Sequence, residues 1–174
     1  SASKNLAKVS LELGGKSPIV VFSDADLEKA ANAVIAGFTD NAGQCCIATS
    51  RLIVQKSIAS DFKNMLALKL QNLNFKQSLA TNDQFNKVKS YIEKANNLLG
   101  EKMIGGKINE GKQYVAPTII ELNDTNHSLF KNEIFGPILV MIRFTNEKNA
   151  LEIANDTNYG LAASIWTNNL ALAN

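Results

Sequence analysis

The stretch Ile19-Val20-Val21-Phe22, followed directly by Ser23-Asp24-Ala25-Asp26, decides the fold class of this chain. An uninterrupted apolar run after Pro18 is typical of a buried strand, and the cluster of serine and aspartate supplies N-caps for a helix. Helical spacing then continues to about Asp40, through Leu27, Ala30, Ala31, Val34, Ile35 and Phe38. The sequence therefore predicts a buried strand and a helix that packs one face against a sheet.

The same alternation of strand and helix patterns continues along the chain. Apolar runs predict further strands at Arg51–Gln55, Met103–Ile104, Tyr114–Leu122, Ile138–Phe144 and Ala162–Trp166. Amphipathic spacing predicts helices at Ile58–Leu73, from a cap at Asn82 to Gly100, at Glu147–Asn155, and from Asn169 onward. Strands that alternate with helices of this length favour βαβ units. The expected fold is α/β, with a mainly parallel twisted sheet flanked by helices.

Two segments between these elements carry more specific expectations. The glycine-rich segment Gly105–Gln113 should form a hairpin-like excursion, and Asp124–Lys131 should be a loop. Pro117 lies inside the predicted strand Tyr114–Leu122, which should therefore be an edge strand or a bent one.

Composition excludes several classes of partner and site. The chain has 174 residues, enough for one domain with a sizeable core, and its formal charge is only +2 without a run of like charge. Nucleic acid and membrane surfaces are therefore not expected as partners, and no apolar run is long enough to span a bilayer. One histidine and two adjacent cysteines lack metal-ligand spacing, so no metal is expected. Two reduced thiols favour a cytoplasmic location.

The cysteines lie in Asn41-Ala42-Gly43-Gln44-Cys45-Cys46, between the first helix and the next strand. A thiol near a helix terminus, with backbone N–H groups around it, is a candidate nucleophile. The alternative is a pair of small buried hydrophobic residues, which is the usual state of free cysteine.

Two further motifs combine a carboxylate with glycines. In Leu11-Glu12-Leu13-Gly14-Gly15-Lys16-Ser17-Pro18, Glu12 is either a general base or a solvent-facing residue on an alternating edge strand. In Asn132-Glu133-Ile134-Phe135-Gly136-Pro137, an extended segment would place Glu133 and Phe135 on one side, which suits a ligand with a ring and hydroxyls. The alternative is a structural turn in which Phe135 fills the core.

Together, L-E-L-G-G-K-S-P at Leu11–Pro18, N-A-G-Q-C-C at Asn41–Cys46 and E-I-F-G-P at Glu133–Pro137 resemble the NAD(P)-dependent aldehyde dehydrogenase superfamily. The resemblance covers essentially the whole chain, including Ala154-Asn155 and Tyr159–Ala162. Within the superfamily, the chain resembles members of the succinate-semialdehyde and lactaldehyde dehydrogenase type. Three motifs in this order and at these separations are specific for that superfamily, whereas any one of them alone would be a weak signal.

The resemblance implies a role for each motif. Cys46, two places after Gly43-Gln44, would be the nucleophile that forms a thiohemiacetal and then a thioester, and its own N–H would be an oxyanion donor. Glu12 would activate the water that hydrolyses the thioester.

The implied cofactor is NAD or NADP. Glu133 would bind the nicotinamide ribose hydroxyls, Phe135 would lie beside the ring, and Leu13 and Gly14 would lie along it with their backbone. No G-x-G-x-x-G follows a strand, and the family's Rossmann-type cofactor domain precedes the first motif. We therefore expect residues 1–174 to be the catalytic domain, truncated at both ends, and to bind NAD weakly without the cofactor domain.

The resemblance also implies a small-molecule aldehyde as substrate and a homo-oligomer for the full-length enzyme. Thr39, Asp40 and Ile47 are expected to line the substrate tunnel, with the identity of the aldehyde left open. The loop Asn74–Thr81 is shortened and altered relative to the family pattern.

Two alternatives to a catalytic domain remain compatible with the sequence. In the first, the chain is a non-catalytic remnant that keeps the fold. A cysteine hydrolase built on Cys46 and His127 is a third hypothesis, which requires that histidine to lie near the thiol. His127 falls in a polar segment, where a surface position is expected.

Overall fold

Strand β1 (Ser17–Val21) forms at the apolar run that predicted it, and helix α1 (Leu27–Thr39) follows with Asp26 as its N-cap. The Asp26 carboxylate accepts a hydrogen bond from the Lys29 backbone N–H (3.1 Å), which satisfies one free donor of the first turn. Strand β2 (Thr49–Gln55) runs parallel to β1 and completes a βαβ unit. The structure is a computed structural model and describes residues 2–97 and 102–173.

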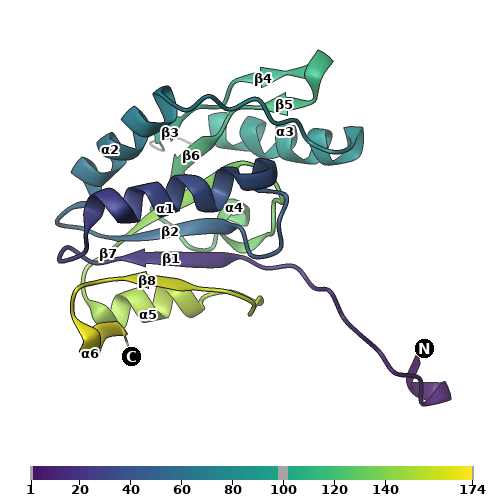
Figure 1. The fold of residues 1–174 in the computed structure, drawn as a ribbon, viewed down its shortest axis with the longest axis horizontal. Helices are drawn as coiled ribbons and strands as arrows, with labels where there is room; N and C mark the ends of the chain where they lie inside the picture. The colour runs from purple at the N-terminus through teal and green to yellow at the C-terminus, as the bar shows by residue number, and fades with distance from the viewer. Residues whose placement is uncertain (1, 98–101, 174) are drawn as a thin grey trace.

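The main sheet has the strand order β3-β6-β7-β2-β1-β8 (Figure 1). Besides β1 and β2 it contains β3 (Lys102–Ile104), β6 (Thr118–Glu121), β7 (Ile138–Phe144) and β8 (Ser164–Trp166). Strand β3 pairs antiparallel with β6, and the other neighbouring pairs are parallel. The predicted α/β fold with a mainly parallel sheet is confirmed.

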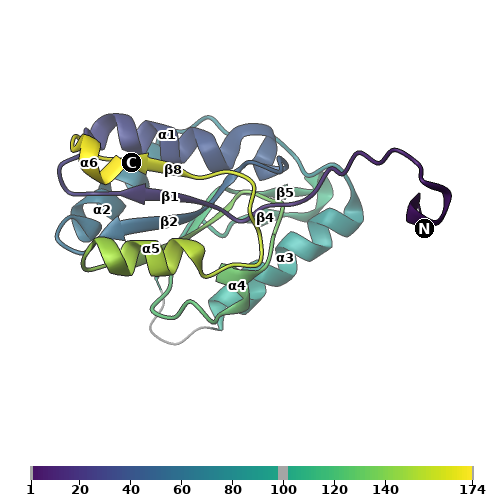
Figure 2. The ribbon, with the colours of Figure 1, turned by 90° about the horizontal axis from the view of Figure 1, so that it is seen from below.

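Helices cover both faces of this sheet (Figure 2). Helices α1 and α2 (Ala59–Gln71) pack on one face, against side chains that include Ile19, Leu52 and Met141. Helices α3 (Asn82–Asn96), α4 (Ser128–Lys131) and α5 (Glu147–Asn155) pack on the other, against side chains that include Val20, Ile53 and Ile142. Because successive residues of a strand point to opposite faces, the continuous apolar strands fill both layers.

Some boundaries differ from the predicted ones. Helix α3 is capped by Thr81, whose hydroxyl accepts a hydrogen bond from the Gln84 N–H (3.2 Å), so the predicted cap Asn82 is the first helical residue. The predicted loop Asp124–Lys131 contains α4, because the His127 side chain caps a short helix. The predicted helix end at Gly100 lies outside the described residues. The other helical elements of the described residues are a last helix, α6 (Leu170–Ala173), and short 3-10 turns at Ala2–Asn5, Asp40–Gly43 and Glu110–Lys112.

Pro117 divides the predicted strand Tyr114–Leu122 in two. The first part, β5 (Tyr114–Val115), pairs antiparallel with β4 (Ile108–Asn109), which confirms the predicted hairpin. The second part, β6, lies inside the main sheet between β3 and β7. Of the two alternatives, an edge strand or a bent one, the interruption at Pro117 is confirmed and the edge position does not apply to β6. The proline, which has no N–H to donate, lies between the two strands.

Within the described ranges, no helix is long and apolar enough to cross a membrane.

Candidate active site

The thiols follow a tight turn at the carboxyl end of α1. Helix α1 ends at Thr39, and Asn41, Ala42 and Gly43 then take successive left-handed conformations, with φ of 47°, 54° and 68°. Residues other than glycine rarely adopt this region, which reverses the chain sharply. We call Asn41–Cys46 the thiol turn. It ends in Cys45 and Cys46, two free and half-buried thiols.

The thiol turn packs against the segment Glu133–Pro137. A Cβ atom at Gly43 would overlap the Gly136 carbonyl oxygen, and one at Gly136 would lie 2.5 Å from Val88 Cγ2 on α3. Both glycines are needed because the two backbones and the helix approach within contact distance. The Gln84 side-chain amide on the same helix donates hydrogen bonds to the carbonyls of Ile134 (3.0 Å) and Phe135 (2.6 Å).

The first motif reaches both of these segments. The Glu133 carboxylate accepts a hydrogen bond from the Gly15 N–H (3.1 Å), and a Cβ at Gly14 would overlap that carboxylate. A Cβ at Gly15 would lie 2.6 Å from the Cys46 carbonyl oxygen. The fold therefore brings Gly14, Gly15, Cys46 and Glu133 together, although they are distant in sequence.

Two hollows meet at Cys45. A narrow cleft is lined by Cys45 together with Gly15, Glu133 and Phe135. On the other side, Cys45 lines an open groove of about 1040 Å³ between α1, α2 and the loop that follows α2. Thr39, Asp40 and Ile47, expected to lie along the substrate path, line this groove as well. Cys46 is half-buried beside Gly15 and lines neither hollow.

Glu12 and Leu13 are not brought into the cluster. Both side chains are exposed, and residues 7–16 form no strand. Figures 1 and 2 show the chain before β1 leaving the body of the domain. The exposure of Glu12 agrees with the alternative given for it, but the edge strand predicted there is absent from the described residues.

Phe135 takes a left-handed conformation, with φ of 59°, so the extended segment predicted around it is wrong. The turn places Ile134 in the core, 2% exposed, and leaves Phe135 half-buried at the cleft. Of the alternative given for this motif, the structural turn agrees with this conformation, but the core position is wrong for Phe135, since Ile134 fills the core.

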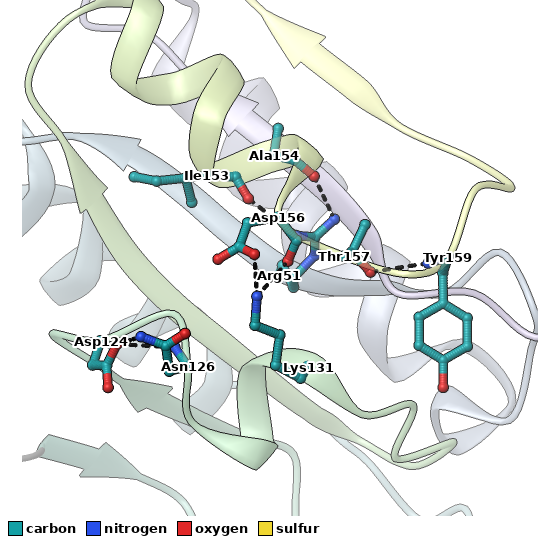
Figure 3. Close-up of polar contacts among 9 residues, drawn as sticks. All are labelled: Arg51, Asp124, Asn126, Lys131, Ile153, Ala154, Asp156, Thr157 and Tyr159. Carbon is teal, nitrogen blue, oxygen red and sulfur yellow. Dashed lines mark hydrogen bonds and ion pairs between the residues drawn. The ribbon is translucent and has the colours of Figure 1, made fainter.

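A second layer of polar contacts holds this region, and sequence reasoning missed it (Figure 3). The buried Arg51 side chain donates hydrogen bonds to the carbonyls of Lys16 (2.6 Å), Ile153 (3.2 Å) and Ala154 (2.8 Å). It thereby ties the start of β1 to the end of α5, and burial lowers the pKa of the Arg51 guanidinium to about 10. A charged residue opening an apolar strand was the only sequence signal.

The loop after α5 supports Glu133 from the other side. The Glu133 N–H donates to the Tyr159 hydroxyl (3.4 Å), and the Tyr159 N–H donates to the Thr157 hydroxyl (3.2 Å). Lys131 forms a hydrogen-bonded ion pair with Asp156. The hydrogen bond from Lys131 holds the pKa of the Asp156 carboxyl below its ordinary value. The backbone of Glu133 is therefore in contact with the loop after α5, while its carboxylate contacts Gly15.

Lys16 is the second buried cation of the region. The side chain is 2% exposed, and its Nζ has no hydrogen-bond partner among the residues that the structure describes. Burial, with the charge of Arg51 added, lowers the pKa of Lys16 from its ordinary 10.5 to about 7. The folded state therefore bears a cost for the charge of this lysine at neutral pH.

His127 lies at neither hollow. Its Nδ1 accepts a hydrogen bond from the Leu129 N–H (3.1 Å) at the start of α4. Over residues 2–97 and 102–173, no group of three or more His, Cys, Asp or Glu side chains is placed to hold a metal ion. The hydrolase hypothesis thus gains no support from the position of its histidine.

Gly43→Ala is expected to lower the free energy of unfolding by about 2–3 kcal/mol. The left-handed backbone at Gly43 is unfavourable for alanine, and the added methyl group would overlap the Gly136 carbonyl. Gly160→Ala is the matched control, because nothing lies within 4 Å of the added methyl group. Urea denaturation of both variants at neutral pH gives the comparison. Equal midpoints for the two variants would show that the thiol turn tolerates a side chain at Gly43.

The aldehyde dehydrogenase family model matches residues 1–174 of this chain. Among curated proteins, the α-ketoglutaric semialdehyde dehydrogenase of Bacillus subtilis (strain 168) is 40% identical over 94% of the chain and 36% of that protein. The peroxisomal aminoaldehyde dehydrogenase 2 of Pisum sativum is 37% identical over 98% of the chain and 36% of that protein.

Solved structures give the same result. An NAD-dependent aldehyde dehydrogenase from Sinorhizobium meliloti superposes with a TM-score of 0.93 and 37% identity, over 99% of this chain and 36% of that one. An indole-3-acetaldehyde dehydrogenase complexed with NAD⁺ has a TM-score of 0.91 and 38% identity, over 99% of this chain and 38% of that one. The chain spans little more than a third of the length of these relatives. By its sequence motifs, its fold and these matches, the chain belongs to the aldehyde dehydrogenase family.

Proposed function

We propose that this chain is the thiol-bearing portion of an enzyme that oxidises an aldehyde to a carboxylic acid with NAD⁺ or NADP⁺. The observation that carries the proposal is the convergence of three motifs. Gly15 lies against the Cys46 carbonyl, and Glu133 accepts a hydrogen bond from Gly15. Relatives named as NAD- and NADP-dependent aldehyde dehydrogenases support the same reaction class.

The residues beside the thiol fit a nicotinamide nucleotide. Gly14 has no side chain, and the space that a Cβ would fill is occupied by the Glu133 carboxylate. A carboxylate beside bare backbone suits ribose hydroxyls, which donate hydrogen bonds to it. We assign Glu133 to the ribose, Phe135 to the nicotinamide ring, and the backbone of Leu13 and Gly14 to the surface along which the ring lies.

Cys46 is assigned as the nucleophile. Its thiolate adds to the aldehyde carbon and forms a thiohemiacetal, and departure of hydride converts this adduct to a thioester. The Cys46 N–H donates to the oxygen that gains charge during the addition. NAD(P)⁺, when bound, accepts the hydride. Water then cleaves the thioester, which releases the carboxylic acid and restores the thiol.

Glu12 is assigned as the base that takes a proton from this water. Its carboxylate is exposed and makes no hydrogen bond with either thiol in the structure. Three residues of extended chain span at most about 10 Å, so the backbone of Glu12 lies within that distance of Gly15. Gly15 in turn contacts Cys46. The assignment thus requires residues 12–14 to bend toward the thiol turn when substrate is bound.

Turnover by the full-length protein tests the proposal. The protein is incubated with aliphatic aldehydes that differ in chain length and terminal charge, with NAD⁺ or NADP⁺, and reduced cofactor and carboxylic acid are quantified. Equal amounts of both products are expected. Absence of both with every aldehyde, in a folded protein whose thiols react with iodoacetamide, would favour the non-catalytic alternative.

A further inference from the structure

The loop that follows α2 is tied to the thiol turn by side-chain hydrogen bonds. We propose that the segment Asn74–Ala80, the brace loop, holds the thiol turn in its strained conformation, with Gln77 as a positioning residue for Cys46. The inference rests on the proposed function only in taking Cys46 as the reactive thiol.

The thiol turn needs support from outside itself. Asn41 and Ala42 are both left-handed; asparagine tolerates this conformation, but it is unfavourable for Ala42. Ala42 is 1% exposed, so water cannot satisfy its backbone N–H. A strained turn with a buried donor persists only where its surroundings supply the missing partner.

Gln77 supplies that partner. Its side-chain oxygen accepts a hydrogen bond from the Ala42 N–H at 2.5 Å, across 35 positions of sequence. The acceptor therefore lies at the centre of the left-handed run, four residues before Cys46.

Gln44 forms a second tie between the same two segments. Its side-chain oxygen accepts from the Ala80 N–H (2.8 Å), and its amide donates to the carbonyls of Asn41 (3.0 Å) and Ser78 (3.5 Å). One side chain thus closes the thiol turn and fastens it to the brace loop, two residues before Cys46.

The brace loop is itself anchored on its far side. Leu79 is 2% exposed and its N–H donates to the Gln113 carbonyl (2.9 Å), while Phe75 contacts the Tyr114 ring at 5.8 Å between centroids. A segment without regular secondary structure is therefore held at its two large apolar residues. Gln77 is itself exposed, and its oxygen reaches Ala42 from a segment that is anchored on both sides of it, as the support of a site requires.

Alkylation of the folded chain tests the proposal without an aldehyde or a cofactor. Iodoacetamide labelling of Cys46 and Cys45 is followed by mass spectrometry in Gln77→Leu, which has no acceptor, and in Gln77→Glu, which keeps one. In the parent protein Cys46 should react faster than Cys45. The Cys46-to-Cys45 rate ratio should fall about tenfold in Gln77→Leu, the scale of one hydrogen bond to a buried group, and stay near the parent value in Gln77→Glu.

A purely structural role for Gln77 would lower the unfolding midpoint in Gln77→Leu and leave the rate ratio in the folded protein unchanged. That result overturns the proposal. If Gln77→Leu does not fold, Gln77→Asn replaces it, because a side chain one methylene shorter withdraws its oxygen from Ala42; an unchanged ratio there is equally adverse. A changed ratio, together with a full-length protein that oxidises no aldehyde, would retain the brace and reject the proposed function.

Discussion

Cys46→Ser is expected to lower the rate of NAD(P)H formation by the full-length protein by about a thousandfold or more, because a serine hydroxyl is a much weaker nucleophile than a thiolate. The same variant should lose the thioester, so no acyl group should be recovered on the peptide that contains the thiol turn. The initial rate with a saturating aldehyde, measured from the absorbance of reduced cofactor, gives the effect.

Cys45→Ser is the matched control, because it changes the neighbouring thiol by the same atom. Cys45 lines both the cleft and the groove, so its replacement is expected to alter KM while kcat stays within about fivefold of the parent value. A loss of kcat in Cys45→Ser together with an active Cys46→Ser would transfer the nucleophile to Cys45. Hydrolysis of 4-nitrophenyl acetate, which needs no cofactor, repeats the comparison independently.

Lys16→Met is expected to raise the free energy of unfolding at neutral pH by about 4 kcal/mol. Burial lowers the pKa of Lys16 from 10.5 to about 7, and every tenfold change in the proton-binding constant corresponds to about 1.4 kcal/mol. Methionine fills a similar volume without a charge, so the variant escapes this penalty. Urea denaturation of both proteins at neutral pH gives the difference.

The pH dependence of the difference provides the decisive control. Between pH 7 and 10.5 the unfolded lysine binds a proton that the folded one does not, so the stability of the parent protein rises with pH across this window. The advantage of Lys16→Met should therefore be largest at or below neutral pH and shrink to about 1–2 kcal/mol near pH 9.5. The charges of Arg51, Glu133 and Lys87 act on the Lys16 ammonium only in the parent protein, so their effect is part of the pH-dependent difference. A difference that is constant with pH would contradict the assignment.

Local signals predicted the elements that depend on neighbouring residues. The bounds of Ile138–Phe144 and Glu147–Asn155 were predicted as observed, because an apolar run and the Asn146 cap define them locally. The cap of α3 was placed one residue late, since Thr81 and Asn82 are both capping residues and only the backbone distinguishes them. A turn at Phe135 was one of the two alternatives, but its left-handed conformation has no local signal, because the Phe135 carbonyl accepts its hydrogen bond from Gln84 on the distant helix α3.

For the candidate site, too, the sequence predicted some features and missed others. The motifs identified the segments that converge, since Gly15, Cys46 and Glu133 meet in the fold. They did not identify Arg51 or Gln77, whose partners are 35 residues or more away and carry no local pattern. The roles of Cys46 and Glu12 come from the family motifs and stay proposals, because the thiol and the carboxylate are not in contact.

The neighbours of β1 also set the order in which the domain can be completed. One neighbour, β2, follows soon after it, but the other, β8, pairs Ser164 with Ile19. During translation, β1 therefore leaves the ribosome before its second neighbour exists. One edge of β1 stays unpaired until almost all of residues 1–174 have been synthesised. A nascent chain stalled before Ser164 would present an open parallel edge, and chaperone binding should concentrate on such intermediates.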